Sequence, residues 1–177
     1  NGHVRGLALK DLDRDGDLDL VAVSGVPSLV AVAKGDGRGK FTSHGTYGIP
    51  ALSQTDLAGP DSVSIGDLNG DGFQDLIIGR GPHAMDTTVA WLEGVGGARF
   101  DSAEVIEVGG IRPRFSVLAD VTGDDTPDLV TVLAGSNLLS VVELGDGGEV
   151  KGVRLTVATG RAPAHLATGD FNGDGRA

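Results

Sequence analysis

Residues 67–75 read DLNGDGFQD, and this nine-residue acidic loop recurs along the chain. Residues 11–19 read DLDRDGDLD, residues 120–128 read DVTGDDTPD, and a fourth copy begins as DFNGDG at residues 170–175. The copies start at positions 11, 67, 120 and 170, so the spacing is 50 to 56 residues. A period of this length is typical of repeat architectures, in which each unit packs against its neighbours.

The loop carries oxygen side chains at positions 1, 3, 5 and 9, which is the pattern expected of a calcium ligand set. Calcium binds six to eight oxygens at roughly 2.3–2.6 Å in a flexible geometry. Glycine at position 6 permits a sharp turn, after which the carbonyl of position 7 faces inward. EF-hand loops open in the same way, but they end with Glu at position 12 and lie between helices. Position 12 of the first copy is Ala22, inside an apolar run, and the flanks resemble strands.

The first two loops predict complete ligand sets. In the first loop the predicted ligands are Asp11, Asp13, Asp15 and Asp19, with the carbonyl of Asp17. In the second loop they are Asp67, Asn69, Asp71 and Asp75, with the carbonyl of Phe73. Both loops keep glycine at position 6, so we expect two structural calcium sites.

The third and fourth loops depart from this pattern. The candidate ligands of the third loop are Asp120, Thr122, Asp124, Thr126 and Asp128. Because Thr122 replaces a carboxylate or amide and Asp125 replaces the glycine, this site is expected to bind weakly or to be closed by hydrogen bonds alone. The fourth loop supplies Asp170, Asn172 and Asp174, and its ninth position would be residue 178.

The alternative interpretation is that Asp, Asn and Gly form these turns without any metal. Turns alone do not require carboxylates at four fixed positions, and packed like charges repel one another without a cation. A cage made only of oxygens, supplied largely by the protein, favours calcium over magnesium.

Composition agrees with this interpretation. The formal net charge is −11, and 14 of the 25 acidic residues lie in the four loops. The acidity is therefore explained mostly by candidate metal ligands. No basic stripe is present, which argues against nucleic-acid binding. The chain has no cysteine, so metal-tied loops would replace disulfides in a secreted protein. Extracellular calcium sites bind at ~10⁻⁴–10⁻³ M, which favours an extracellular, cell-surface or periplasmic location.

No signal peptide or membrane span is visible in the sequence. The chain starts without Met and stops within a motif, as expected of a piece of a longer polypeptide.

Short apolar runs bounded by Gly and Asp predict strands around the loops. Strands are expected before the loops at 7–9, 63–65, 117–119 and 166–167, and after them at 18–23, 76–78 and 129–133. Third strands are expected at 29–33, 89–92 and 138–144, and fourth strands at 41–47, 100–108 and 150–157. The GDGRGK stretch at 35–40 resembles a phosphate loop only superficially and is predicted to be a hairpin turn.

Four short strands per unit of about 50 residues indicate an all-β fold of β-propeller blades, each with four antiparallel strands. The predicted single repeat domain, 1–177, contains blades at 1–55, 56–109 and 110–160 and the start of a fourth at 161–177, about three and a third blades. Long flexible connections are expected at 49–60 and 79–86. Since propellers need about four to eight blades, either further sequence completes the disc or other chains pair with its open edges.

The stretches SIGDLNGDGFQDLII at 64–78 and ATGDFNGDG at 167–175 resemble the FG-GAP/VCBS repeat family. This family builds the integrin alpha-subunit propeller and many bacterial surface proteins. The resemblance covers essentially the whole chain and implies calcium binding by 11–19 and 67–75 on one face of the disc. The third loop departs from the family pattern. Integrin-type Phe-Gly and Gly-Ala-Pro markers are missing, so the chain is more similar to the bacterial type, and no ligand specificity carries over.

The expected function is a calcium-stabilised, non-catalytic binding or scaffold module that meets a protein or glycan on a cell surface or matrix. One alternative is a glycan-binding propeller, either a lectin or an accessory domain of a polysaccharide-degrading enzyme. Another is a self-assembling subunit that pairs through open blade edges. Catalysis is not expected, because the four histidines hold unrelated positions in the repeat and no Gly-x-Ser-x-Gly elbow or Cys nucleophile is present. Aromatic residues are only 4% of the chain, and Trp91 is expected to be buried, which disfavours a sugar platform.

Overall fold

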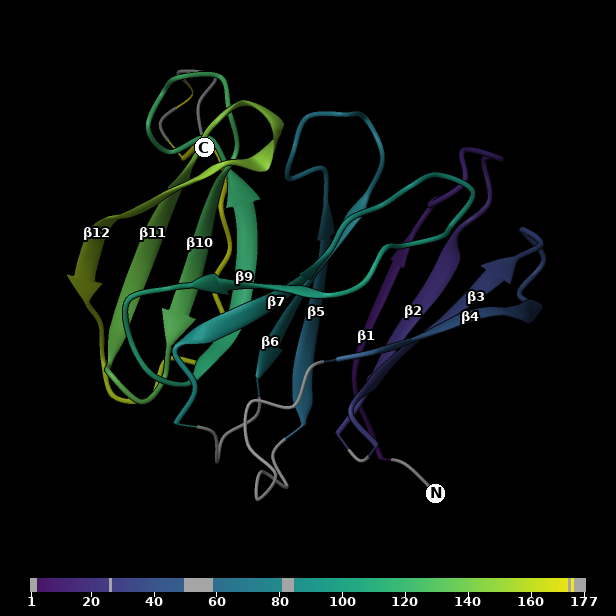
Figure 1. The fold of residues 1–177 in the computed structure, drawn as a ribbon, viewed down its shortest axis with the longest axis horizontal. Helices are drawn as coiled ribbons and strands as arrows, with labels where there is room; N and C mark the ends of the chain where they lie inside the picture. The colour runs from purple at the N-terminus through teal and green to yellow at the C-terminus, as the bar shows by residue number, and fades with distance from the viewer. Residues whose placement is uncertain (1–2, 26, 50–58, 81–84, 172, 174–177) are drawn as a thin grey trace.

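The computed structural model of the chain describes residues 3–25, 27–49, 59–80, 85–171 and 173. These residues form three four-stranded antiparallel sheets, in each of which the strands are ordered as they are in the chain. The sheets lie side by side in Figure 1, with the first sheet at the right and the third at the left. The chain therefore forms part of a β-propeller, and the predicted all-β blade fold is confirmed.

The strand bounds follow the predicted apolar runs closely. The first sheet contains β1 (Val4–Lys10), β2 (Asp19–Ser24), β3 (Leu29–Gly35) and β4 (Phe41–Gly48). The second sheet contains β5 (Pro60–Gly66), β6 (Asp75–Arg80), β7 (Thr88–Leu92) and β8 (Glu104–Glu107). The third sheet contains β9 (Pro113–Ala119), β10 (Asp128–Leu133), β11 (Leu138–Leu144) and β12 (Val150–Ala158).

Helical structure is nearly absent from the described residues. A three-residue 3-10 turn, η1 (Asp146–Gly148), joins β11 to β12. No helix in the described part of the chain is long and apolar enough to cross a membrane.

The first strands of successive sheets lie next to one another, around what would be the axis of the disc. Ser62 and Ser64 of β5 donate side-chain hydrogen bonds to backbone carbonyls of β9. The Asp61 carboxylate lies 2.9 Å from an Arg114 nitrogen of β9 and 3.9 Å from an Arg5 nitrogen of β1. These polar contacts fix the lateral spacing of the three innermost strands.

Two apolar cores lie between the sheets and hold the blades together. The first core joins the first and second sheets and includes Val21, Val23, Val30, Leu76, Ile78 and Leu92. The second core joins the second and third sheets and includes Leu68, Ile77, Val89, Leu129, Leu133 and Leu144. All six residues of β6 and of β10 are buried. β6 lies between two neighbouring sheets, whereas the outer face of β10 lies beside residues 166–168.

Two predicted strands differ from the structure. The segment 100–108 was expected to be one strand, but β8 covers only Glu104–Glu107, and Phe100 forms an isolated bridge with Gly94. The Phe100 ring turns instead toward Tyr47 of the first sheet, in a T-shaped contact with centroids 5.5 Å apart.

The second difference concerns the expected strand at 166–167. These residues form no strand, because no segment in the described part of the chain pairs with them. Residues 166–168 instead lie over the outer face of the third sheet, beside Val130 and Val141. Residues 50–58 and 81–84, within the two predicted long connections, lie outside the described residues.

Candidate metal centre

The acidic loops are the β1–β2, β5–β6 and β9–β10 connections, and they lie at the same end of the three sheets (Figure 1). In each of these loops the first Asp closes the turn by accepting at least two backbone N–H groups. Asp11 accepts from Arg14 at 2.7 Å and from Gly16 at 3.0 Å. Asp67 accepts from Gly70 at 2.7 Å and from Gly72 at 2.8 Å. The loop shape is therefore fixed locally by its own sequence.

The third and fifth positions continue this pattern in the first loop. The Asp13 carboxylate accepts the Asp15 N–H at 3.3 Å, and the Asp15 carboxylate accepts the Asp17 N–H at 2.8 Å. One carboxylate oxygen from each of Asp11, Asp13 and Asp15 lies within 4.8 Å of the others. This acidic group could hold a metal ion, and a set of hard oxygen donors suits calcium.

The second loop repeats this geometry with an amide at the third position. The Asn69 side-chain oxygen accepts the Asp71 N–H at 3.1 Å, and the Asp71 carboxylate accepts the Phe73 N–H at 2.7 Å. The two loops therefore repeat the same pattern of hydrogen bonds between side chains and backbone.

The carboxylate at the ninth loop position also accepts backbone hydrogen bonds, which the sequence did not predict. Asp19 is fully buried, and its two oxygens accept the backbone N–H groups of Leu12 and Gly35, each at 3.0 Å. It therefore ties the loop to the end of β3, sixteen residues away. A carboxylate has about four lone-pair sites, so these bonds leave acceptor capacity for a cation.

Asp75 repeats the arrangement in the second sheet. It is fully buried and accepts from Leu68 at 2.8 Å and from Gly94 at 2.7 Å. Burial raises the pKa of the Asp75 carboxyl above its ordinary value, and the nearby Asp71 carboxylate adds to this shift, while the two backbone donors oppose it. A divalent cation in the loop would favour the ionised form.

Gly35 and Gly94 are needed where the ninth position is tied. A Cβ on Gly35 would clash with the backbone carbonyl of Leu18, and one on Gly94 would clash with that of Gln74. Glycine therefore lets the end of the loop approach the neighbouring strand closely enough for the hydrogen bond. The sequence predicted only a hairpin turn at Gly35, and the separation from the ninth loop position differs between the sheets, sixteen residues for Gly35 and nineteen for Gly94.

The third loop lacks this connection. Leu144 holds the register position of Gly35 in the third sheet, and its side chain is buried. Asp128 accepts the N–H groups of Val121 and Thr122 at 3.1 Å through one oxygen. Its other oxygen is buried and has no hydrogen-bond partner in the described part of the chain.

Hydrogen bonds also close the remainder of the third loop. Asp120 accepts the N–H groups of Gly123 and Asp125 at 2.6 and 3.0 Å, and the Thr126 hydroxyl donates to Asp124. Asp125 takes the left-handed conformation, with φ at 65°, that Gly16 and Gly72 have in the first two loops. In the fourth loop Asp170 accepts the Gly173 N–H at 2.6 Å, and Asn172 and Asp174 lie outside the described residues.

Arg14 links the first loop to the second. It sits at the fourth loop position with φ at 65°, where the other loops have Gly70, Gly123 and Gly173. Its guanidinium donates to the Gly72 carbonyl and lies 5.1 Å from the centroid of the Phe73 ring. A non-glycine residue in this conformation is strained, so the contacts with the second loop offset a backbone cost.

Two substitutions separate these opposing effects. We expect Arg14→Ala to lower the free energy of unfolding by about 1–2 kcal/mol, because the strain stays while the cation–π and hydrogen-bond contacts are lost. Arg14→Gly loses the same contacts but relieves the strain, so it should be more stable than Arg14→Ala by about 1 kcal/mol. Urea unfolding of both variants measures the difference. Equal stability of the two variants would contradict the strained conformation.

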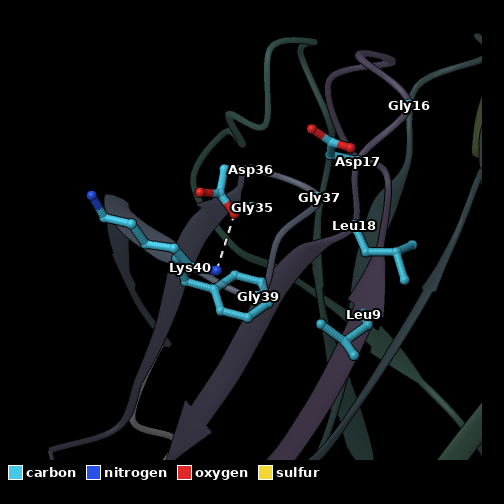
Figure 2. A pocket seen from close by; sticks show the side chains of 10 residues that line it. Leu9, Gly16, Asp17, Leu18, Gly35, Asp36, Gly37, Gly39 and Lys40 are labelled. Atoms are coloured by element: carbon cyan, nitrogen blue, oxygen red, sulfur yellow. Dashed lines mark hydrogen bonds between the residues drawn. The ribbon is translucent and has the colours of Figure 1, made fainter.

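A hollow of about 370 Å³ lies beside the first loop, on the side of the first sheet that faces away from the second. Figure 2 shows the residues that line it, among them the apolar Leu9 and Leu18 and the charged Asp17, Asp36 and Lys40. Asp36 accepts the backbone N–H of Lys40 at 3.0 Å. The predicted hairpin turn at 35–40 is confirmed, since β3 ends at Gly35 and β4 begins at Phe41.

Comparison with solved structures shows the same fold in a known protein. The chain is similar to the structure of the periplasmic gluconolactonase PpgL of Pseudomonas aeruginosa, with a TM-score of 0.72 and 18% sequence identity. The match covers 94% of this chain and 42% of that one, so the chain spans less than half of the length of this neighbour. A comparison with curated proteins found no match.

Comparison with protein families matches the sequence itself. The FG-GAP-like repeat matches twice, at residues 11–78 and at residues 67–131, and each match begins at the first Asp of an acidic loop. Together the matches cover more than half of the chain. The chain therefore belongs to the FG-GAP-like repeat family.

Proposed function

We propose that the chain is a calcium-stabilised, non-catalytic binding or scaffold module of a protein that acts outside the cytoplasm. The observation that carries the proposal is the convergence of Asp11, Asp13 and Asp15 in a loop whose donor positions recur in the second sheet. The loops would hold calcium through the ligands that the sequence predicts. Calcium would neutralise the clustered carboxylates and so stabilise the hairpins that carry them.

Calcium removal tests this proposal directly. A chain that uses calcium structurally melts at a lower temperature in chelator than in calcium, whereas a chain with metal-free turns melts at the same temperature in both. The location follows from the expected affinity, because sites of ~10⁻⁴–10⁻³ M fill at extracellular calcium concentrations. A cell-surface, extracellular or periplasmic setting is therefore part of the proposal.

A non-catalytic role is supported by the arrangement of the polar groups. His3 precedes β1, His44 lies in β4 and His165 follows β12, so these side chains come from unrelated parts of the repeat. His165 packs against the Phe115 ring, with centroids 5.3 Å apart. The gluconolactonase is an enzyme by its printed name, but likeness at this identity concerns the fold, and its activity is not transferred.

The partner is proposed to be a protein or glycan on a cell surface or matrix. Trp91 is half-buried against the second core, so it offers little exposed ring to a sugar. A glycan array separates the two partner classes, since binding to defined glycans would favour the lectin alternative.

Self-association is a second proposal, and it rests on the two end faces. Val63 and Phe100 of the second sheet are only 6% and 7% exposed where they pack on the first sheet. Their counterparts on the free face of the first sheet, Leu7 and Phe41, are 64% and 41% exposed. On the outer face of the third sheet, part of which residues 166–168 cover, Val121 is 41% exposed, whereas its counterpart Leu68 is 1% exposed. The exposed parts of these two end faces correspond to the two halves of the existing interface, and we propose that a second copy joins them head to tail.

We expect the chain to form larger species as its concentration rises, and Leu7→Glu to shift it toward the monomer, because a charge then enters the apolar contact. Sedimentation velocity measures the size. Val105→Glu is the matched control, because Val105 is exposed on β8, away from both end faces. A monomer at every concentration would exclude self-association.

A further inference from the structure

One position outside the acidic loops carries a charged side chain in each sheet, and in the first two sheets this side chain contacts the loop. This position directly precedes Gly35, Gly94 or Leu144 at the end of the third strand, and we name it the pre-turn position. It is occupied by Lys34 in the first sheet and by Glu93 in the second. The two loops therefore receive opposite charges at the same place in the fold.

Lys34 inserts a positive charge into the first ligand cluster. Its Nζ lies 2.6 Å from a carboxylate oxygen of Asp13. Asp13 belongs to the group of converging carboxylates with Asp11 and Asp15. The Lys34 side chain is 34% exposed, so its long flexible stem can swing the ammonium group into water.

Glu93 supports the corresponding side chain of the second loop. One of its carboxylate oxygens accepts a hydrogen bond from the Asn69 side-chain nitrogen at 2.7 Å. Because an ionised carboxylate only accepts hydrogen bonds, this contact fixes the amide nitrogen toward Glu93. The amide oxygen accepts the Asp71 N–H at 3.1 Å, and the amide nitrogen also donates to the Asp71 carboxylate at 3.2 Å.

In the third sheet neighbouring cations neutralise the charge at the pre-turn position. Glu143 holds the pre-turn position there, but it is paired with Arg154 at 2.6 Å and with Lys151 at 3.3 Å. Lys151 also lies 3.8 Å from an oxygen of Asp124 in the third loop. The contrast between Lys34 and Glu93 is therefore specific to the two loops with complete ligand sets.

We infer that the pre-turn position sets the calcium affinity of each loop, with Lys34 acting as a built-in competitor and Glu93 as a supporting group. This inference rests on the proposed calcium sites and names their regulation. In the first loop a cation must displace the Lys34 ammonium group from Asp13. In the second loop Glu93 holds the Asn69 oxygen inward and adds a negative charge nearby.

The two loops therefore bind calcium in a fixed order as its concentration rises. The second loop fills at a lower calcium concentration, and the first loop fills later and releases Lys34 to the surface. A calcium-dependent positive charge then appears next to the first loop, where an acidic partner could use it.

The test is calorimetric titration of the metal-free chain with calcium chloride. Asp71→Ala isolates the first loop, and Asp15→Ala isolates the second. In the Asp71→Ala chain, Lys34→Met should tighten calcium binding by about ten-fold or more. The substitution removes a positive charge that repels calcium and competes with it for Asp13. In the second background Glu93→Gln should weaken binding by about 10-fold, the lower end of the usual effect of a group that orients a ligand.

Lys40→Met and Glu107→Gln are the matched controls, because they remove the same charges from exposed positions outside the loops. Circular dichroism of the metal-free variants checks that each one folds. Equal affinities for Lys34→Met and Lys40→Met, with calcium bound in both, would overturn the inference and leave the proposed function intact. If neither the unaltered chain nor any variant takes up calcium, both the inference and the proposed function are wrong.

Discussion

Calcium at about 1 mM is expected to raise the melting temperature of the metal-free chain by roughly 2–11 °C. Each site with an affinity of ~10⁻⁴–10⁻³ M adds about 0.4–1.4 kcal/mol to the free energy of unfolding by mass action. Two filled sites add about twice that, and 1 kcal/mol shifts the melting temperature of a domain of this size by about 2–4 °C. Thermal unfolding in chelator and in calcium, followed by circular dichroism, measures the shift.

Single-site variants divide this shift between the loops. Asp71→Ala should remove the part that comes from the second loop, and Asp15→Ala the part from the first. Asp101→Ala is the control, because it removes one exposed carboxylate outside the loops and should leave the calcium-dependent shift unchanged. If Lys34 competes in the first loop, the larger loss belongs to Asp71→Ala. An identical melting curve in chelator and in calcium would rule out a structural role for the metal.

The second large effect concerns the buried ninth position of the loops. In chelator, Asp75→Asn is expected to lower the free energy of unfolding by about 1–3 kcal/mol, whereas Asp128→Asn should change it by less than about 1 kcal/mol. Asp75 accepts a backbone N–H with each of its oxygens. An amide group at this position keeps one acceptor and turns an N–H₂ group toward a second backbone donor.

Asp128 differs because only one of its oxygens accepts hydrogen bonds from backbone donors. The other oxygen is buried without a partner among the described residues. The amide nitrogen of Asn can take that place without losing a hydrogen bond, and the substitution also removes a buried charge. Urea unfolding of both variants and of the unaltered chain tests this. An equal loss of unfolding free energy for Asp75→Asn and Asp128→Asn would contradict this explanation. It would show that Leu144 in place of glycine does not change how the ninth loop residue is bound.

The acidic loops and most strands could be predicted from the sequence because their determinants are local. Asp11 and Asp67 bind backbone N–H groups within five residues along the chain, so the turn forms from its own sequence. The run 138–144 predicted the bounds of β11 correctly because it is a mostly apolar segment, interrupted by Ser140 and Glu143, between the turn residues Asn137 and Gly145. The period of the loops then fixed the number of strands in each unit, and hence the propeller fold.

Tertiary structure decided the contacts that join one unit of the repeat to the next strand or the next sheet. Lys34 meets Asp13 and Glu93 meets Asn69 only because sheet register brings the end of the third strand beside the loop. Arg14 reaches Gly72, 58 residues away, because neighbouring sheets pack with their loops at the same end. Such partners depend on the relative placement of whole elements, which the burial of two apolar cores determines. The sequence therefore named the residues of the loops, while packing determined which charges surround them.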